Sequence, residues 1–166
     1  MEIERKFLVK GVPDLYRAEC KHIEQVYLEI GEREVRIRKT NKGCFLTIKK
    51  GKGLEREEKE KSISLAEYNM LLESKPIVGH AIKKKRYVLP IGKGLNAELD
   101  IYEGALDGLR TVEVEFTSKK QALSFHPPEW FGEDVTEDSR FKNASLAVKG
   151  MPALDGAVAQ GPKLKK

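Results

Sequence analysis

The chain has 166 residues, enough for one domain with a buried core, and 34 % of them are charged against 40 % hydrophobic. The 31 Lys and Arg exceed the 26 Asp and Glu only slightly, giving a net charge of +5, which excludes a chain dominated by a polybasic or acidic disordered segment. Two cysteines, Cys20 and Cys44, are too few for a disulfide framework. No apolar run has the ~18–20 residues of a membrane span or the pattern of an export signal, so we expect a cytoplasmic protein with free thiols.

Apolar and polar residues alternate with a period of two along most of the chain, which is typical of β-strands. The alternation predicts eight strands, at 2–9, 22–30, 34–39, 45–49, 55–61, 82–89, 97–102 and 111–117. Short segments rich in Gly and Asn, such as 31–33 and 41–43, separate several of them and are typical of hairpin loops. This succession predicts a mainly β (α+β) fold built on one antiparallel sheet or barrel.

Helical patterns are few and short. They cover 65–74, 119–125 and 138–148. A capping box, with Ser64 at the N-cap and Glu67 three residues later, precedes the first of them, which ends before Pro76. Residues 151–166 are rich in Ala, Gly, Pro and Lys and lack periodicity, so we expect a disordered tail after one domain at 1–150.

The charged residues follow a pattern of their own, because side chains two residues apart share one face of a strand. Like-charged pairs at this spacing occur on six strands: Glu2/Glu4, Arg36/Arg38, Glu58/Glu60, Lys84/Arg86, Glu98/Asp100 and Glu113/Glu115. The solvated outer face of a sandwich is the ordinary explanation, but such a face gains from interspersed signs. Like charges ~7 Å apart are tolerable when opposite charges lie on neighbouring strands.

A barrel with these faces turned inward would place groups of carboxylates beside groups of Arg and Lys. Carboxylate oxygens suit hard cations such as Mg²⁺ or Mn²⁺. Lys and Arg suit phosphate oxygens, which Arg can bind through two hydrogen bonds at once. The charge pattern therefore predicts a site for a metal–polyphosphate complex, with the apolar faces outward and partly covered by the helices.

Several charged motifs follow one another along the chain. They are EIERK at 2–6, VRIR at 35–38, LTIK at 46–49, REEKE at 56–60, KKRY at 84–87, ELD at 98–100, EVE at 113–115 and DVTEDSRFKN at 134–143. Together they resemble the motifs of the CYTH superfamily, the triphosphate tunnel metalloenzymes, over about residues 1–148. Phe141 stands where the family usually has Tyr, so a role for that hydroxyl is lost.

The resemblance implies an eight-stranded antiparallel β-barrel that forms a tunnel, and hydrolysis of a phosphoanhydride bond with Mg²⁺ or Mn²⁺. The metal ligands it implies are Glu2, Glu4, Glu113 and Glu115. The residues it implies as catalytic helpers are Glu58, Glu60 and Lys84. The triphosphate would be held by Lys6, Arg36, Arg38, Lys49, Arg56, Lys84 and Arg86. One metal would bridge the phosphates, and a second would position and acidify the attacking water.

Inorganic triphosphate is the substrate we favour, because no set of aromatic or hydrogen-bonding residues is committed to a base or a thiazole. An adenylate cyclase of the class IV type and a thiamine or nucleoside triphosphatase remain alternatives, since they share the same triphosphate grip. A non-catalytic polyphosphate or nucleotide sensor is an alternative of another class, which the many carboxylates disfavour. The basic run at 83–86 divides between two strand faces, so we expect neither nucleic acid nor a membrane as partner. The sequence leaves open a monomer or a homodimer.

Overall fold

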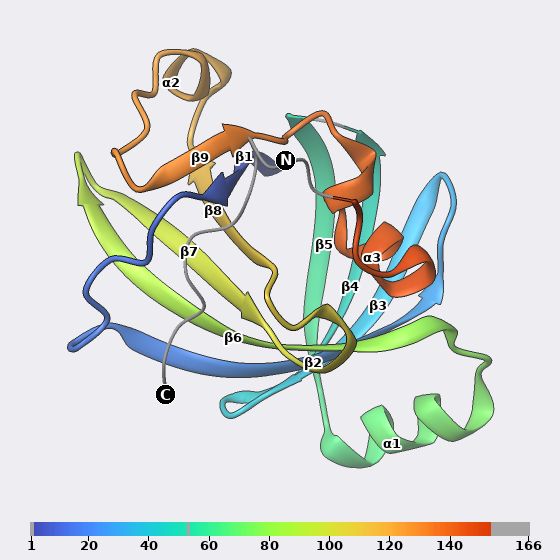
Figure 1. Ribbon diagram of the computed structural model, residues 1–166. Helices are drawn as coiled ribbons and strands as arrows, with labels where there is room; N and C mark the ends of the chain where they lie inside the picture. Colours follow the sequence, from blue (N-terminus) through green and yellow to red (C-terminus); the bar gives the residue numbers. More distant parts are fainter. Residues whose placement is uncertain (1, 53, 154–166) are drawn as a thin grey trace.

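The computed structural model describes residues 2–52 and 54–153 (Figure 1). Within them, nine strands form one sheet in the order β5-β4-β3-β2-β6-β7-β8-β1-β9. These strands are β1 (Glu2–Val9), β2 (Glu19–Glu29), β3 (Arg33–Thr40), β4 (Gly43–Lys52), β5 (Glu55–Ile63), β6 (Val78–Gly92), β7 (Leu95–Tyr102), β8 (Arg110–Phe116) and β9 (Phe131–Asp134). The predicted tail at 151–166 lies, from residue 154 onward, outside the described residues.

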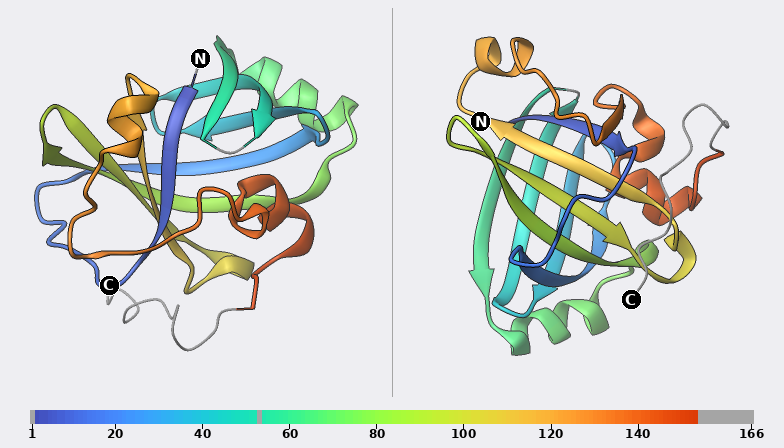
Figure 2. Two further views of the ribbon diagram at one scale, coloured as in Figure 1. Left: turned by 90° about the horizontal axis from the view of Figure 1, so that it is seen from above. Right: turned by 60° about the vertical axis from the view of Figure 1, so that its left-hand side comes forward.

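The first eight strands close into a barrel because β1 pairs with β5 as well as with β8. Glu2 faces Arg56 across the closing seam, and β1 pairs along most of its length with β8 on its other side. Every one of these pairings is antiparallel, and the three views show the strands wrapping around one interior (Figures 1 and 2). The predicted eight-stranded antiparallel barrel is confirmed.

Helices cover part of the apolar outer face, as the alternation predicts. The capping box forms at the start of α1 (Leu65–Ser74), where Ser64 Oγ accepts a hydrogen bond from the Glu67 backbone N–H. On this helix Tyr68 is fully buried and packs with Val26 and Ile37 of the barrel wall. Since α1 and α2 (Lys119–Leu123) lie on opposite sides of the barrel, they cover different parts of its wall (Figures 1 and 2).

A second apolar cluster lies on the outer face of β1, β7 and β8. It contains Phe7 and Val114 from the barrel, Ala122 from α2 and Phe131 from β9. The strand β9 was not predicted from the sequence. It pairs with the end of β1, where Phe7 faces Asp134, and this pairing depends on a partner more than 120 residues away in the chain.

A third apolar cluster packs against α3 (Asn143–Lys149). It joins Tyr27, Tyr102 and Leu8, which face inward, to Ala144 and other apolar residues of the C-terminal segment. Beside it, β6 approaches α3 so closely at Gly79 that a Cβ there would lie 2.4 Å from the Ala147 carbonyl oxygen. The inward-facing members of this cluster continue the inward faces of the charged strands.

The prediction of a single continuous helix at 138–148 is wrong. The segment divides into a 3₁₀ turn, η2 (Ser139–Phe141), and α3, because Lys142 between them is extended, with φ −69° and ψ 140°. The side chain of Asp138 caps the turn by accepting from the Arg140 backbone N–H, which favours a separate start there. The helix predicted at 119–125 ends two residues early, at Leu123. A further 3₁₀ turn, η1 (Gly104–Leu106), joins β7 to β8. Within the described ranges, no helix is both long and apolar enough to cross a membrane.

Candidate active site

The barrel interior holds a cavity of about 180 Å³ to which all eight barrel strands contribute side chains. The predicted site residues that line it are Glu2, Glu4, Lys6, Arg36, Arg38, Lys49, Arg56, Glu58, Arg86, Glu113 and Glu115. Residues whose side chains point to the same face of each strand thus meet in one place, as the spacing of two residues requires.

Two predicted residues are not among those that line the cavity. Glu60 is exposed near the end of β5, where its carboxylate accepts a hydrogen bond of 2.9 Å from the Thr47 hydroxyl. Lys84 is fully buried in the barrel wall, and its ammonium group lies 2.7 Å from Asp100 and donates to the Asn143 side-chain oxygen at 3.4 Å. Lys84 therefore supports the cavity from behind, while Glu60 lies to one side of it.

Three carboxylates gather where β1, β5 and β8 meet. Glu2, Glu58 and Glu115 each bring one oxygen atom within 4.8 Å of the other two. Burial, followed by the hydrogen bond with Glu58, raises the pKa of Glu2 to about 7, and burial with the charges of Glu2 and Glu98 raises the pKa of Glu115. One ammonium group, that of Lys49, lies near this group, 3.2 Å from Glu2 and 3.9 Å from Glu58.

The donor set fits a divalent cation. Three carboxylates at this spacing repel one another, and an ion such as Mg²⁺ or Mn²⁺, which prefers oxygen ligands, would relieve that repulsion. Among the described residues, Oε1 of Glu2 is buried and accepts no hydrogen bond, and its ion-pair partner is the Lys49 ammonium group at 3.2 Å. Of the four metal ligands expected from the sequence, this cluster contains Glu2 and Glu115, and it adds Glu58.

The remaining two, Glu4 and Glu113, form a separate acidic pair. Burial and the charge of Glu113 raise the pKa of Glu4 well above its usual range. Burial opposes ionisation of Glu113 as well, but Lys6, at 3.6 Å, and Arg86 together lower its pKa well below the usual range. Of the two carboxyl groups, Glu113 is therefore the one that ionises more readily and Glu4 the one that holds its proton more readily.

Basic side chains of β3, β4 and β5 form the wall next to the carboxylate cluster. Arg36 lies 3.9 Å from Glu58, and Arg56 lies 3.0 Å from Glu34. The Nε atoms of both arginines are buried and donate no hydrogen bond to the described residues. Because an unpaired buried donor is unfavourable, these guanidinium groups are poised for an anionic ligand.

On the opposite wall, Asp100 lies between two cations. Its carboxylate accepts hydrogen bonds of 2.7 and 2.9 Å from Arg86 and lies 2.7 Å from Lys84. Although burial favours the neutral acid, the charges of Arg86 and Lys84 lower the pKa of Asp100 to about 2. Burial, only partly opposed by Asp100, lowers the pKa of Lys84 to about 7.

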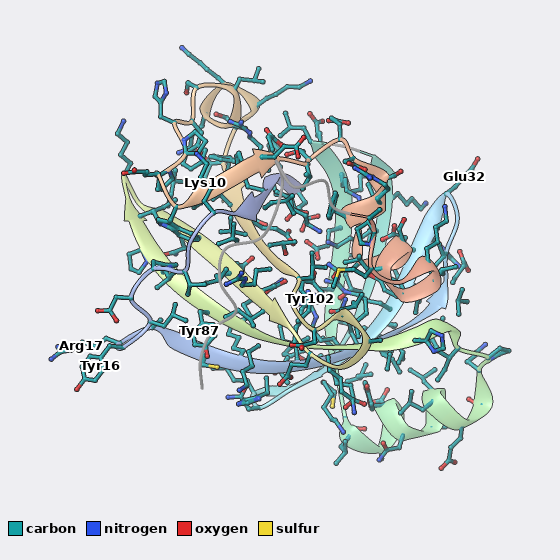
Figure 3. All side chains as sticks on the ribbon, viewed as in Figure 1. Lys10, Tyr16, Arg17, Glu32, Tyr87 and Tyr102 are labelled. Carbon is teal, nitrogen blue, oxygen red and sulfur yellow. The ribbon has the colours of Figure 1, made fainter. Side chains whose placement is uncertain are left out.

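The cavity also has lining residues that the sequence did not assign to a site. They are Tyr27, Glu34, Glu98, Val135, Thr136, Asp138, Lys142 and Asn143. Glu34 precedes Arg36 by two residues, so the alternation contained the signal for it. Asn143 starts α3 and accepts a 2.7 Å hydrogen bond from the hydroxyl of Tyr102, which lies below α3 in Figure 3. Only the fold brings this segment to the cavity.

Known proteins resemble this chain over most of its length. The chain is 41 % identical to an inorganic triphosphatase of Nitrosomonas europaea over 149 residues, 89 % of this chain and 97 % of the relative. It is 34 % identical to an inorganic triphosphatase of Acetivibrio thermocellus over 152 residues, 87 % and 92 % of the two chains.

Solved structures also resemble this chain. The crystal structure of the inorganic triphosphatase NE1496 matches with a TM-score of 0.66 and 38 % identity, over 92 % of this chain and 97 % of that one. A putative adenylate cyclase from Bacillus halodurans shares the fold, with a TM-score of 0.60 at 20 % identity, over 94 % and 95 % of the two chains. The model of the CYTH domain matches residues 1–150, and the chain therefore belongs to the CYTH family.

Proposed function

We propose that this protein hydrolyses inorganic triphosphate to pyrophosphate and phosphate, with a divalent cation bound in the barrel cavity. The observation that carries the proposal is the contact between two kinds of groups in one cavity. The carboxylate cluster of Glu2, Glu58 and Glu115 lies directly beside the basic wall, where Lys49 is within 4 Å of two of its members. Two relatives of similar length that are named inorganic triphosphatases support the assignment.

The basic side chains that line the cavity would bind the phosphoryl groups. Arg36 and Arg38 come from β3 and Arg56 from β5, on either side of β4, and all three present planar guanidinium groups, which suit phosphate oxygens. Lys6 of β1 and Arg86 of β6 also line the cavity. A linear triphosphate can contact several of them at once, and such charge neutralisation and positioning dominate catalysis of phosphoryl transfer.

The carboxylate cluster would hold the cation. Bound Mg²⁺ or Mn²⁺ would neutralise phosphate charge and lower the pKa of a coordinated water molecule. Glu2, Glu58 and Glu115 would bind it through oxygen atoms, while Lys49 keeps the cluster close to the basic wall. Lys84, which Asp100 holds, would keep positive charge behind the cavity.

Phosphate release from inorganic triphosphate tests the proposal directly. We expect turnover with Mg²⁺ or Mn²⁺, and none in excess EDTA, because the carboxylates need a cation to accept the substrate's charge. Undiminished turnover in EDTA would contradict the metal site. Binding of triphosphate without release of phosphate under any of these conditions would identify a sensor and not an enzyme.

A further inference from the structure

One polar residue next to the cavity is not explained by the proposed site. Gln25 of β2 is fully buried and faces Arg38 of β3 across the strand pair. Its side-chain oxygen accepts a hydrogen bond of 3.1 Å from the Arg38 Nε–H. Its Nε2 donates no hydrogen bond to the described residues. A buried donor without a partner is destabilising. Methionine would fill the same space and has no such donor. Packing alone therefore does not explain why an amide occupies this position.

The partners of the other cavity-lining cations explain the amide at this position. Carboxylates lie within 4.0 Å of each of five: Lys6, Arg36, Lys49, Arg56 and Arg86. Arg38 differs from these five, because among residues 2–52 and 54–153 no carboxylate lies within 4.0 Å of it. A phosphoryl group that binds one of the five must compete with a carboxylate already there, whereas at Arg38 it meets a guanidinium group whose charge is not neutralised.

Gln25 can keep that charge available because it is neutral. Glutamate has nearly the same shape, and at the same 3.1 Å separation it would form a buried ion pair with Arg38. The amide oxygen instead orients the guanidinium group through Nε and leaves its positive charge for a ligand. This explains why an amide, with the cost of an unpaired donor, stands at this point in the barrel wall.

We propose that Gln25 is a positioning residue, which orients the phosphate-binding Arg38 and keeps its charge available, so that Arg38 binds one phosphoryl group of a polyphosphate without a metal. This inference rests on the proposed function, since it names the point in the cavity where the substrate or its pyrophosphate product is held independently of the carboxylate cluster. The product would then remain bound at Arg38 when the cation is removed.

The test compares two substitutions of one residue. Gln25→Glu adds a negative charge against Arg38, whereas Gln25→Met removes the hydrogen bond and leaves the charge. The same change at a half-buried position that does not line the cavity, Gln121→Glu on α2, is the matched control. Binding of pyrophosphate in EDTA is measured by calorimetry for the full chain, with thermal melting as a check on folding and KM and kcat for triphosphate with Mn²⁺.

We expect wild type and Gln121→Glu to bind pyrophosphate in EDTA equally, and Gln25→Glu to lose about tenfold or more in affinity, with a matching rise in KM. Gln25→Met should lose clearly less. Equal losses in Gln25→Glu and Gln25→Met would assign Gln25 to packing and overturn the proposal, as would wild type that fails to bind pyrophosphate in EDTA. These binding results do not depend on turnover, so they are distinguishable from a failure of the triphosphatase assignment.

Discussion

Asp100 illustrates how one buried carboxylate organises a wall of the cavity. It is fully buried between Arg86 and Lys84, and neither cation would be stable there alone, because an isolated buried charge is strongly unfavourable. Its ionised form is therefore part of the folded structure. The stability of the folded chain therefore depends on pH through the ionisation of Asp100.

Stability should fall in acid as Asp100 takes up a proton. Its pKa is about 2 in the folded chain against 3.8 for a free side chain, so the folded state binds this proton less tightly. The contribution to the free energy of unfolding is then present above pH ~3.8 and is lost as the pH falls through about 2. It amounts to roughly 2 kcal/mol, at ~1.4 kcal/mol per pKa unit.

Acid unfolding followed by circular dichroism, with carbon NMR of the Asp100 carboxyl group, measures this effect. Between about pH 4 and about pH 2, the free energy of unfolding should decrease by roughly 2 kcal/mol less in Asp100→Asn than in wild type. If the variant does not fold, the NMR titration of the wild type still decides: an Asp100 pKa at or above the value of a free side chain contradicts the prediction.

Glu58 and Glu60 offer a matched pair of residues on one strand. Glu58 belongs to the carboxylate cluster, whereas Glu60 is exposed and bound to the Thr47 hydroxyl. We predict that Glu58→Gln lowers kcat/KM for triphosphate by about 100-fold or more and raises the Mn²⁺ concentration needed, as loss of a metal ligand does. Glu60→Gln should stay within about threefold of wild type. Similar losses in both variants would place Glu60 in the site as well.

The residues that line the cavity show which site residues can be predicted from the sequence. The spacing of two residues identified most of the charged side chains that meet in the cavity, because a strand fixes which face each one occupies. Glu34 was missed although it shares a face with Arg36. Tyr27 lies on a strand without a like-charged pair, and Asn143 reaches the cavity from a distant segment, so no local pattern marks them.

Among the secondary-structure elements, α3 is held in place by its contact with β6. Gly79 has φ +75°, and a Cβ there would lie 2.4 Å from the Ala147 carbonyl oxygen. We predict that Gly79→Ala lowers the free energy of unfolding by more than the ~1–2 kcal/mol that a left-handed alanine costs, because α3 must also shift. Turnover should fall too, since α3 carries Asn143 into the cavity wall.

The control for this variant has the same backbone conformation in open space. Gly94, in the turn between β6 and β7, also has φ +75°, and nothing lies within 4 Å of its Cβ position. Gly94→Ala should therefore cost only the backbone term and keep full activity. Chemical denaturation and phosphate release are measured for both variants, and equal effects would show that the contact with α3 is unimportant.

The number of barrel strands could be predicted, and the resemblance implied their closure, but the order of the strands and the elements outside the barrel could not. Alternation over long segments identifies strands, and eight of them with short loops favour closure. β9 has only four residues, and its position depends on Arg5, whose guanidinium group binds the Ala122 carbonyl oxygen and Asp134. Such long-range contacts fix short elements more firmly than local propensity does.

In the molecule as a whole, the cavity is close to electrical balance. Its lining has eight acidic residues, Glu2, Glu4, Glu34, Glu58, Glu98, Glu113, Glu115 and Asp138, and seven basic ones, Lys6, Arg36, Arg38, Lys49, Arg56, Arg86 and Lys142. A polyanion therefore gains little from the overall charge and depends on contacts with particular cations and with a metal. Discrimination between substrates should follow from how many of these contacts each one makes.

This balance leads to a prediction about substrate choice. Inorganic triphosphate has two free ends and can present oxygens to cations on both walls of the cavity, whereas the nucleoside of ATP blocks one end and removes a negative charge there. One charge-assisted contact is worth about 1.5–3 kcal/mol, and tenfold corresponds to ~1.4 kcal/mol. We expect kcat/KM for triphosphate to exceed that for ATP by about 10- to 100-fold.

A nucleoside would also need a partly apolar site for its base, and the lining residues are mostly charged, with Tyr27, Val135, Thr136 and Asn143 as the uncharged ones. Thiamine triphosphate carries the same handicap at its organic end, so it belongs in the comparison. The three substrates are assayed side by side with Mg²⁺ and with Mn²⁺, and the ATP products are examined for cyclic AMP. Equal kcat/KM for triphosphate and ATP, or cyclic AMP among the products, would assign the cavity to a nucleotide, because only a base bound outside the charged lining could compensate for the lost terminal contact.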